Sequence, residues 1–177
     1  MHLGRSQDGW TLIELVLIMF LLGIAAAIAM PNVSNMTGTK ASAVARKLQA
    51  DLSYAQGLAM TQRLRHRVYF NLAPAPVPQG YAVVNDADGD GTWGEAGESA
   101  RDPLGGGSLS VTLNTGDYAG ITLTAIGFAG QYVEFDTLGV PYSSAGALAA
   151  ITSVTVSGGS TNQPVRVVLQ TGSVLSP

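Results

Sequence analysis

Three aspartates at alternate positions, Asp86, Asp88 and Asp90, form the clearest metal-binding pattern in the chain. With the glycine that follows, they match D-x-D-x-D-G, the opening of a calcium-binding loop, where the glycine permits a sharp turn. The match then stops, because the twelfth position is Gly97 and a glutamate, Glu98, comes one residue late. A calcium loop needs a bidentate glutamate at that position. The sequence therefore predicts at most a variant calcium site.

Two interpretations of this acidic loop stay open. In the first, Glu95 or Glu98 completes a calcium site, and the cation relieves the repulsion among the three aspartates. In the second, the loop is a solvated hairpin tip, whose Asp and Gly residues serve turn geometry alone, and no cofactor is required. In either case we expect Trp93 to pack the loop against a sheet.

A single carboxylate, Glu14, lies in an otherwise apolar stretch. Every other residue from Leu12 to Met30 is apolar or glycine. A helix of about 20 apolar residues can span a bilayer, and an ionised group inside one costs on the order of 3 kcal/mol. Glu14 is therefore a functional-site candidate. The alternative is an uncleaved signal anchor in which the carboxylate is incidental.

The sequence offers no enzyme active site. It has no cysteine and no G-x-S-x-G motif, and its two histidines are His2 and His66. Glu134 and Asp136 stand two residues apart, so they would share one face of a strand, where we expect them to be solvated. We therefore expect a protein that is not an enzyme.

The elements that position these residues follow two periodicities. Apolar residues recur at spacings of three and four from Val44 to Ala59, which predicts one apolar helix face, with Lys47 and Asp51 falling mostly elsewhere. Gly23 and Gly38 are expected to loosen this helix. Later segments alternate apolar and polar residues between glycine-marked turns, which predicts antiparallel sheets. The expected strands cover residues 68–72, 80–85, 109–114, 120–126, 132–136, 151–157 and 165–170.

A short basic cluster, Arg63, Arg65 and Arg67, follows the expected helix. The favoured interpretation is a helix C-terminus whose cations complement the helix dipole. The alternative is a patch that binds nucleic acid. The cluster is short and lacks interleaved aromatic residues, and the formal net charge of the chain is −3. Nucleic acid is therefore a disfavoured partner.

The N-terminal junction GWTLIE, from Gly9 to Glu14, leads into the apolar run and Pro31, and it resembles the N-terminus of type IV pilins and type II secretion pseudopilins. In that superfamily a prepilin peptidase cuts after the glycine, and the new N-terminal residue is methylated. The resemblance implies that Trp10, which stands where phenylalanine is usual, becomes this residue. It also implies that Glu14 helps dock the subunit into a filament.

Later segments resemble the GspH/FimT branch of that superfamily. They are Leu52-Ser53-Tyr54-Ala55, the Gly80-Tyr81 strand that runs into the acidic loop, and a Phe-Asp-x-x-Gly turn at Phe135. Some members of the branch bind DNA through a basic C-terminal segment, but Ser173 stands here where arginine is common. A DNA-uptake function is therefore disfavoured.

The resemblance implies an α+β, type IV pilin-like fold, in which a long N-terminal helix with a membrane half and an amphipathic half carries an antiparallel β-sheet domain. The expected parts are a leader peptide over 1–9, a transmembrane or filament-core helix over 10–31, an amphipathic helix over 32–66 and a periplasmic β domain over 67–177. The helix is expected to continue past Pro31.

The implied function is that of a minor pseudopilin, a structural subunit of a type II secretion pseudopilus that supports protein export. It would be held in the bacterial inner membrane by a single-pass helix before assembly. Its partners would be the prepilin peptidase, other pseudopilins or pilins in a helical filament, the inner-membrane assembly platform and membrane lipid. The alternative is a type IV pilus minor pilin for pilus priming or for DNA or ligand binding.

Overall fold

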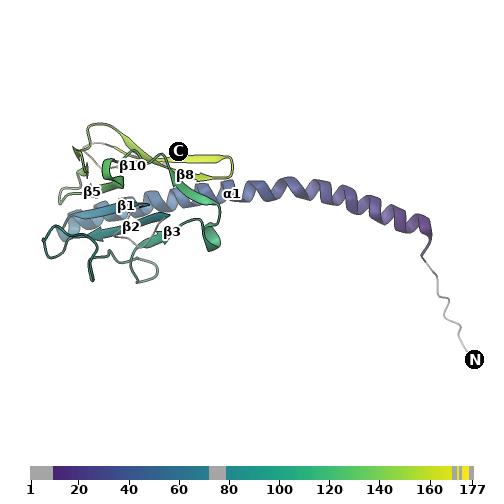
Figure 1. The fold of residues 1–177 in the computed structure, drawn as a ribbon, viewed down its shortest axis with the longest axis horizontal. Helices are drawn as coiled ribbons and strands as arrows, with labels where there is room; N and C mark the ends of the chain where they lie inside the picture. The colour runs from purple at the N-terminus through teal and green to yellow at the C-terminus, as the bar shows by residue number, and fades with distance from the viewer. Residues whose placement is uncertain (1–9, 72–78, 169–170, 172, 176–177) are drawn as a thin grey trace, which may run out of the picture. The chain divides into compact units, whose positions relative to one another are not determined.

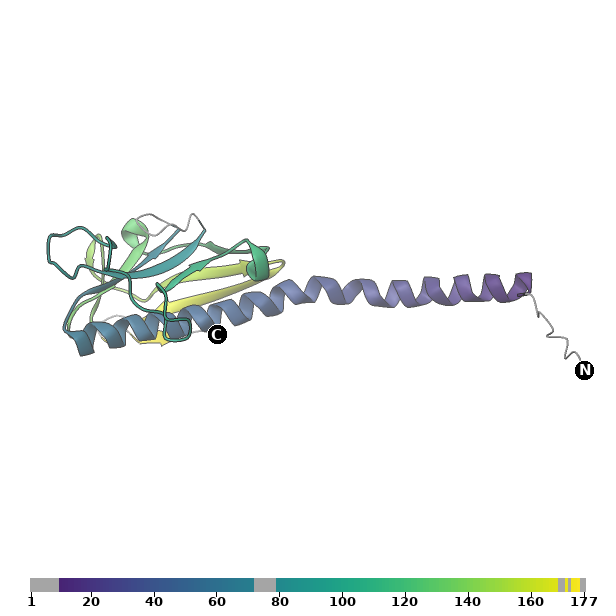
Figure 2. The same cartoon turned by 90° about the horizontal axis from the view of Figure 1, so that it is seen from below.

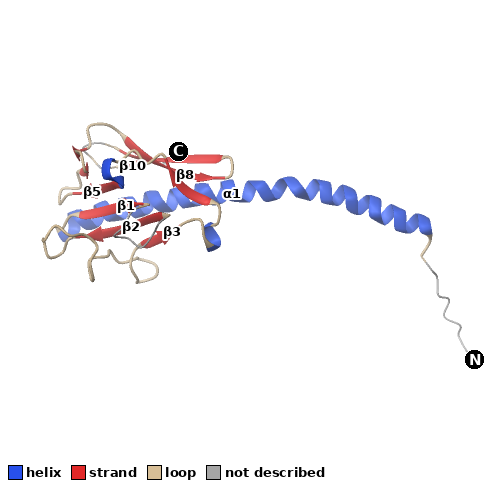
Figure 3. Cartoon of the chain, in the orientation of Figure 1, coloured by secondary structure: helices blue, strands red, loops and turns tan. Residues whose placement is uncertain are grey.

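The computed structural model describes residues 10–71, 79–168, 171 and 173–175 of the 177-residue chain, and side chains 28–35 are outside the description. Gly9 and the expected leader therefore lie outside the described residues. Figure 3 shows one long helix followed by short strands. The described elements are α1 (Leu12–Gln62), β1 (His66–Phe70), β2 (Gly80–Asn85), β3 (Ser110–Thr112), η1 (Gly116–Tyr118), β4 (Ile121–Thr124), η2 (Ala129–Gln131), β5 (Tyr132–Phe135), β6 (Pro141–Ser143), β7 (Gly146–Ala147), β8 (Thr152–Gly158), β9 (Thr161–Val167) and β10 (Val174–Leu175).

The chain divides into two compact units, residues 1–36 and 37–177. Helix α1 continues through Pro31, as expected, and ends at Gln62, four residues before the expected boundary at 66. Within the described helical residues, no stretch is both long enough and apolar enough to cross a membrane, so the span expected over 10–31 is not found.

The described strands of the second unit form two sheets, and every strand pair is antiparallel, which confirms the predicted sheet type (Figure 1). The larger sheet has the order β3-β2-β1-β5-β6-β7, and the smaller has the order β10-β9-β8-β4. Asn71 links the two sheets, because its Nδ2 donates to Leu123 O of β4 at 3.2 Å and its Oδ1 accepts from Gly80 N of β2 at 2.9 Å.

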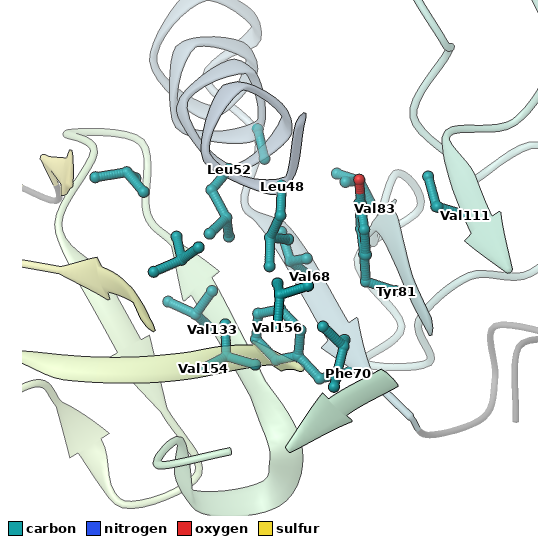
Figure 4. Packing of buried hydrophobic residues seen from close by; sticks show 14 of the residues in the cluster. Leu48, Leu52, Val68, Phe70, Tyr81, Val83, Val111, Val133, Val154 and Val156 are labelled. Atoms are coloured by element: carbon teal, nitrogen blue, oxygen red, sulfur yellow. The ribbon is translucent and has the colours of Figure 1, made fainter. Parts of the chain in front are cut away.

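The core lies between the strands and the part of α1 from residue 37 onward, which runs along them (Figure 2). Figure 4 shows Leu48 and Leu52 pointing from α1 toward Val68, Val133 and Val156. Burial of each such side chain contributes about 1.5–3 kcal/mol. The helix contributes one buried stripe, which confirms the predicted apolar face: Ala41, Val44, Leu48, Leu52, Ala55 and Ala59.

Two glycines allow α1 to lie close to the β8–β9 hairpin. A Cβ on Gly158 would lie 2.9 Å from the Cβ of Ala41, and a Cβ on Gly38 would lie 2.5 Å from Thr161 Oγ1. These distances are shorter than real Cβ contacts. The missing side chain of Gly38 therefore serves close packing of α1 against this hairpin.

A buried polar group ties the helix to the larger sheet. Asp51 is only 7% exposed, and its Oδ2 accepts from Tyr81 OH at 2.6 Å and from Lys47 Nζ at 3.0 Å. The prediction that Asp51 falls away from the packed face is therefore wrong, because its partner is on β2. Burial and the adjacent Asp51 carboxylate raise the pKa of Tyr81 well above its usual value, so its hydroxyl stays a donor.

Replacement of Tyr81 by phenylalanine should lower the free energy of unfolding by about 1.5–3 kcal/mol, because a buried carboxylate loses a hydrogen-bond donor. Chemical denaturation of the detergent-solubilised chain measures this. Tyr54→Phe is the matched control, since Tyr54 OH donates to Arg101 O at 3.3 Å in an exposed position. Equal effects of the two substitutions would contradict the structural role of the Asp51–Tyr81 bond.

Candidate functional site

The start of α1 carries the first predicted site. Thr11 caps the helix, because the Glu14 N–H donates to Thr11 Oγ1 at 3.3 Å and to Thr11 O at 3.1 Å. Threonine followed three residues later by glutamate is the pattern of a capping box. The capping role of Thr11 was not predicted from the sequence, although the T-x-x-E spacing was a sufficient signal. Glu14 itself is exposed.

The helical residues that follow expose apolar side chains. These side chains cover all sides of the helix because they occupy consecutive positions. The most exposed of them, Leu12, is 83% exposed. A helix that is apolar all round belongs in a buried environment. The exposed large apolar side chains of this segment are Trp10, Leu12, Ile13, Leu15, Val16, Leu17, Met19, Phe20, Leu21, Leu22 and Ile24.

The acidic loop between β2 and β3 is the second predicted site. Its carboxylates form two groups whose candidate ligand atoms lie within 4.8 Å of one another: Asp86 with Asp88 and Glu98, and Asp88 with Asp90 and Glu95. Calcium binds oxygen at 2.3–2.6 Å, so two ligands of one ion are at most about 5 Å apart. Each group therefore fits the spacing of a calcium site, and Asp88 belongs to both.

Backbone N–H groups already organise these carboxylates. Asp86 accepts from Gly89 N at 2.9 Å and from Gly91 N at 3.2 Å. Glu98 is only 5% exposed and accepts from Ala87 N at 2.7 Å, so it joins the two ends of the loop. The glutamate that the sequence places one residue late thus lies beside the first aspartates, as the variant site requires.

The neighbouring carboxylates of the loop change the pKa of Glu95. The nearby charge of Asp90, followed by partial desolvation and Asp88, raises the pKa of Glu95 above its usual value. Glu95 and Asp90 are both exposed. This repulsion is the electrostatic stress that a bound cation would relieve.

Two residues of the basic cluster, Arg65 and Arg67, form ion pairs with Glu134 of the larger sheet. Arg67 Nη2 contacts Glu134 Oε2 at 2.6 Å and Arg65 Nη1 contacts Glu134 Oε1 at 3.0 Å. The guanidinium of Arg67 lies 3.8 Å from the ring centroid of Trp93 and 4.0 Å from that of Tyr132. The expectation of a solvated Glu134 is wrong, because Arg67 of β1 and Arg65 just before β1 both lie beside it.

The last turn of α1 contains no basic residue, so the basic cluster does not complement the helix dipole as expected. Arg63 follows the helix with a positive φ of 54°. Asp136 serves a turn, accepting from Leu138 N at 2.9 Å and Val140 N at 2.8 Å. Trp93 is buried against Val84 at the base of the acidic loop, which confirms its predicted packing.

His66 is buried at the start of β1. Its Nδ1 lies 2.9 Å from Leu64 O, and its Nε2 has no hydrogen-bond partner among the described residues. Burial lowers the pKa of His66 below the usual 6.5, although the Leu64 carbonyl partly opposes this. The imidazole is therefore neutral, with Nδ1–H as the donor.

The fold and the sites define a class of protein: an antiparallel β-sheet domain on a helix whose first part exposes apolar side chains. No family model matches the chain, and no curated protein matches it. Among solved structures it is similar to the type IV minor pilin FimU of Pseudomonas aeruginosa strain PAO1. The identity is 14% over 77% of this chain and 91% of that chain, with a TM-score of 0.42. Similarity this low supports no assignment of function, so the evidence for function must come from the residues of this chain.

We propose calcium as the cation of the acidic loop, and millimolar calcium should raise the melting temperature by mass action. Calcium at 100 times its Kd stabilises by about 2.7 kcal/mol. Asp88→Asn should abolish the shift, because Asp88 belongs to both ligand groups. Asp117→Asn, an exposed change outside the loop, should keep it. Thermal melts with calcium and with chelator measure the shift, and its absence in the wild-type chain would contradict the calcium proposal.

The free energy of unfolding should fall as the pH drops below about 6.5. The pKa of His66 is lower in the folded chain than in the unfolded chain, so the unfolded chain binds more protons in this window. Above pH 6.5 His66 is neutral in both states, and its contribution to the free energy of unfolding is fully present. As the pH falls from 6.5 to the pKa of His66 in the folded chain, this contribution decreases by up to about 1.4 kcal/mol per pH unit. Urea titrations of the wild-type chain and His66→Asn measure the difference, since other titrating groups are common to both. Parallel pH profiles would contradict this role.

Proposed function

We propose that this chain is a minor pseudopilin, a structural subunit of a type II secretion pseudopilus that assembles after cleavage between Gly9 and Trp10. The observation that supports this most is the apolar surface of α1 from Leu12 to Ile24, which is exposed on all sides and begins within the junction GWTLIE. Such a surface must be covered, and a bundle of like helices covers every side at once.

The proposed assembly has two stages. Before assembly, lipid of the inner membrane contacts the apolar side chains, while the sheet domain lies in the periplasm. During assembly, guided by the inner-membrane platform, the helix leaves lipid and packs among the helices of other subunits. Glu14 is exposed at the start of this surface. Inside a helix bundle its carboxylate needs a cationic partner, and a buried pair of this kind can set register.

A type IV pilus minor pilin remains the alternative function. A minor pilin would have the same N-terminal helix and the same cleavage after Gly9 as a pseudopilin. The two would differ in the proteins that the sheet domain contacts. The form that binds nucleic acid through Arg63, Arg65 and Arg67 has weaker support, because Glu134 pairs with two of these three cations. Phosphate binding needs several available cations in one place. No enzymatic activity is proposed.

Gly9→Ala should leave the precursor uncut when it is co-expressed with a prepilin peptidase, while the wild-type chain should yield a mature protein that begins at Trp10. Intact mass and N-terminal sequencing measure both. Equal cleavage of the variant and the wild-type chain would contradict the proposal that residues 1–9 are a leader peptide cut after Gly9. Asp8→Ala is the matched control next to the junction and should still be cut.

Two substitutions separate the assembly role of Glu14 from its capping position. Glu14→Gln removes the charge but keeps a side chain that serves equally well at the third position of a capping box. Thr11→Ala removes the cap and should cost about 1 kcal/mol of helix stability. We expect Glu14→Gln to abolish incorporation into sheared filaments and Thr11→Ala to retain it. Normal incorporation of Glu14→Gln would refute the assembly role.

A further inference from the structure

Two buried side-chain atoms of the described residues have no hydrogen-bond partner, and both lie in the larger sheet. They are Nε2 of His66, at the start of β1, and Oδ1 of Asn85, at the end of β2. The two residues are direct partners in the antiparallel β1–β2 ladder. Since a buried polar atom without a partner lowers stability, two such atoms at one position of a ladder call for a single explanation.

The side chains of His66 and Asn85 point to the same side of the sheet. Paired residues of an antiparallel ladder share a face, and their Cβ atoms are about 4.5–5.5 Å apart. Val68 and Val83, each two residues along the strand from one of them, lie in the core that packs against α1 (Figure 4). Alternation along each strand therefore places the imidazole and the amide on the α1 side, within reach of each other.

The hydrogen-bonding roles of the two side chains conflict while His66 is neutral. Its Nδ1–H donates to Leu64 O at 2.9 Å, so Nε2 carries a lone pair and can only accept. Oδ1 of Asn85 is also an acceptor, and two acceptors do not bond to each other. A proton on Nε2 removes this conflict, because a charged imidazole donates from both nitrogens.

We propose that Asn85 Oδ1 accepts a hydrogen bond from His66 when the imidazole is protonated, and that this bond limits the loss of stability in acid. The bond joins the first residue of β1 to the last residue of β2, and the ends of a ladder are where it opens most readily. It is internal to the sheet domain, so it does not depend on the proposed filament function.

The charged groups of the neighbouring elements are engaged with other partners. On its other side His66 pairs with Phe135 of β5, and the last two turns of α1, from Ala55 to Gln62, contain no titratable residue. Burial and the Leu64 carbonyl are the causes of the lowered pKa of His66. This leaves Asn85 as the acceptor opposite Nε2. The charged residues on the adjoining strands and loop pair as follows: Arg65 and Arg67 with Glu134, and Asp86 and Glu98 with backbone N–H groups of the acidic loop.

Nuclear magnetic resonance of the full chain in detergent tests the bond directly. His2→Gln leaves His66 as the only histidine, so isotope-labelled histidine reports the protonation of each ring nitrogen without overlap. At neutral pH we expect a protonated Nδ1 and an unprotonated Nε2. Below the titration midpoint of the imidazole, both nitrogens should carry a proton.

Two changes at Asn85 should move this midpoint in opposite directions. Asn85→Leu keeps the size of the side chain but removes the acceptor, so the midpoint should fall by about one pH unit. Asn85→Asp puts a negative charge beside the imidazole, so the midpoint should rise by at least about one pH unit. Asn162→Asp, the same change at an exposed position of β9, is the matched control and should leave the midpoint in place.

Urea titrations at neutral and acid pH measure the effect on stability. Because the midpoint in the folded chain is lower in Asn85→Leu, this variant should lose more stability than the wild-type chain as the pH falls through both midpoints. A midpoint lower by about one pH unit corresponds to a roughly tenfold lower ratio of folded to unfolded chain after both have titrated.

A protonated Nε2 at neutral pH, or a midpoint that is unchanged or raised in Asn85→Leu, would overturn the inference. Equal midpoints of Asn85→Asp and Asn162→Asp would also overturn it, because the two side chains would then be out of reach of each other. If Asn85→Leu does not fold, the isosteric Asn85→Asp decides. None of these results bears on the proposed function, which cleavage and incorporation test separately.

Discussion

The packing of one face of α1 against two sheets is the constraint on which the second unit depends. Its stripe of alanines, valines and leucines lies where strands from both sheets converge. Small residues matter as much as large ones, because Gly38 and Gly158 let the helix approach the β8–β9 hairpin. Since the chain has no cysteine, this packing has no disulfide to support it. The two layers are therefore held by closely fitting side chains and by hydrogen bonds such as that between Tyr81 and Asp51.

Charged groups inside this unit are tolerated because each has partners. Asp51 is satisfied by Tyr81 and Lys47, and Glu134 by two arginines. Removal of one partner from such a buried arrangement costs more than its formation gains. These ties join α1 to β2 and β1 to β5, so they favour one pairing of strands over its alternatives. They also reduce the charge that the basic cluster offers to a ligand.

The sequence predicted what local periodicity determines. The apolar stripe of α1, the approximate positions of β1 and β2 and the antiparallel sheets follow from spacings of three, four and two residues. It failed where a partner lies far along the chain. Asp51 meets Tyr81 across 30 residues, and Arg67 meets Glu134 across 67, so no local pattern could identify either residue as buried. Only the capping pattern of Thr11 and Glu14 was local and overlooked.

The two parts of α1 have different physical requirements, and this difference links the fold to its function. From Ala41 onward the helix is amphipathic, and its own sheets cover its apolar stripe. From Leu12 to Ile24 it is apolar on every side, and no described residue covers it. Thr11 can satisfy backbone groups at the start of this segment, but a helix cap does not explain the apolar surface around it. A cap does not explain the charge of Glu14 either, because an uncharged glutamine would serve equally well in a capping box. A negative charge is useful there only if its final environment contains a positive one. Under the proposed function, cleavage after Gly9 would create such a charge nearby, the new amino group of Trp10.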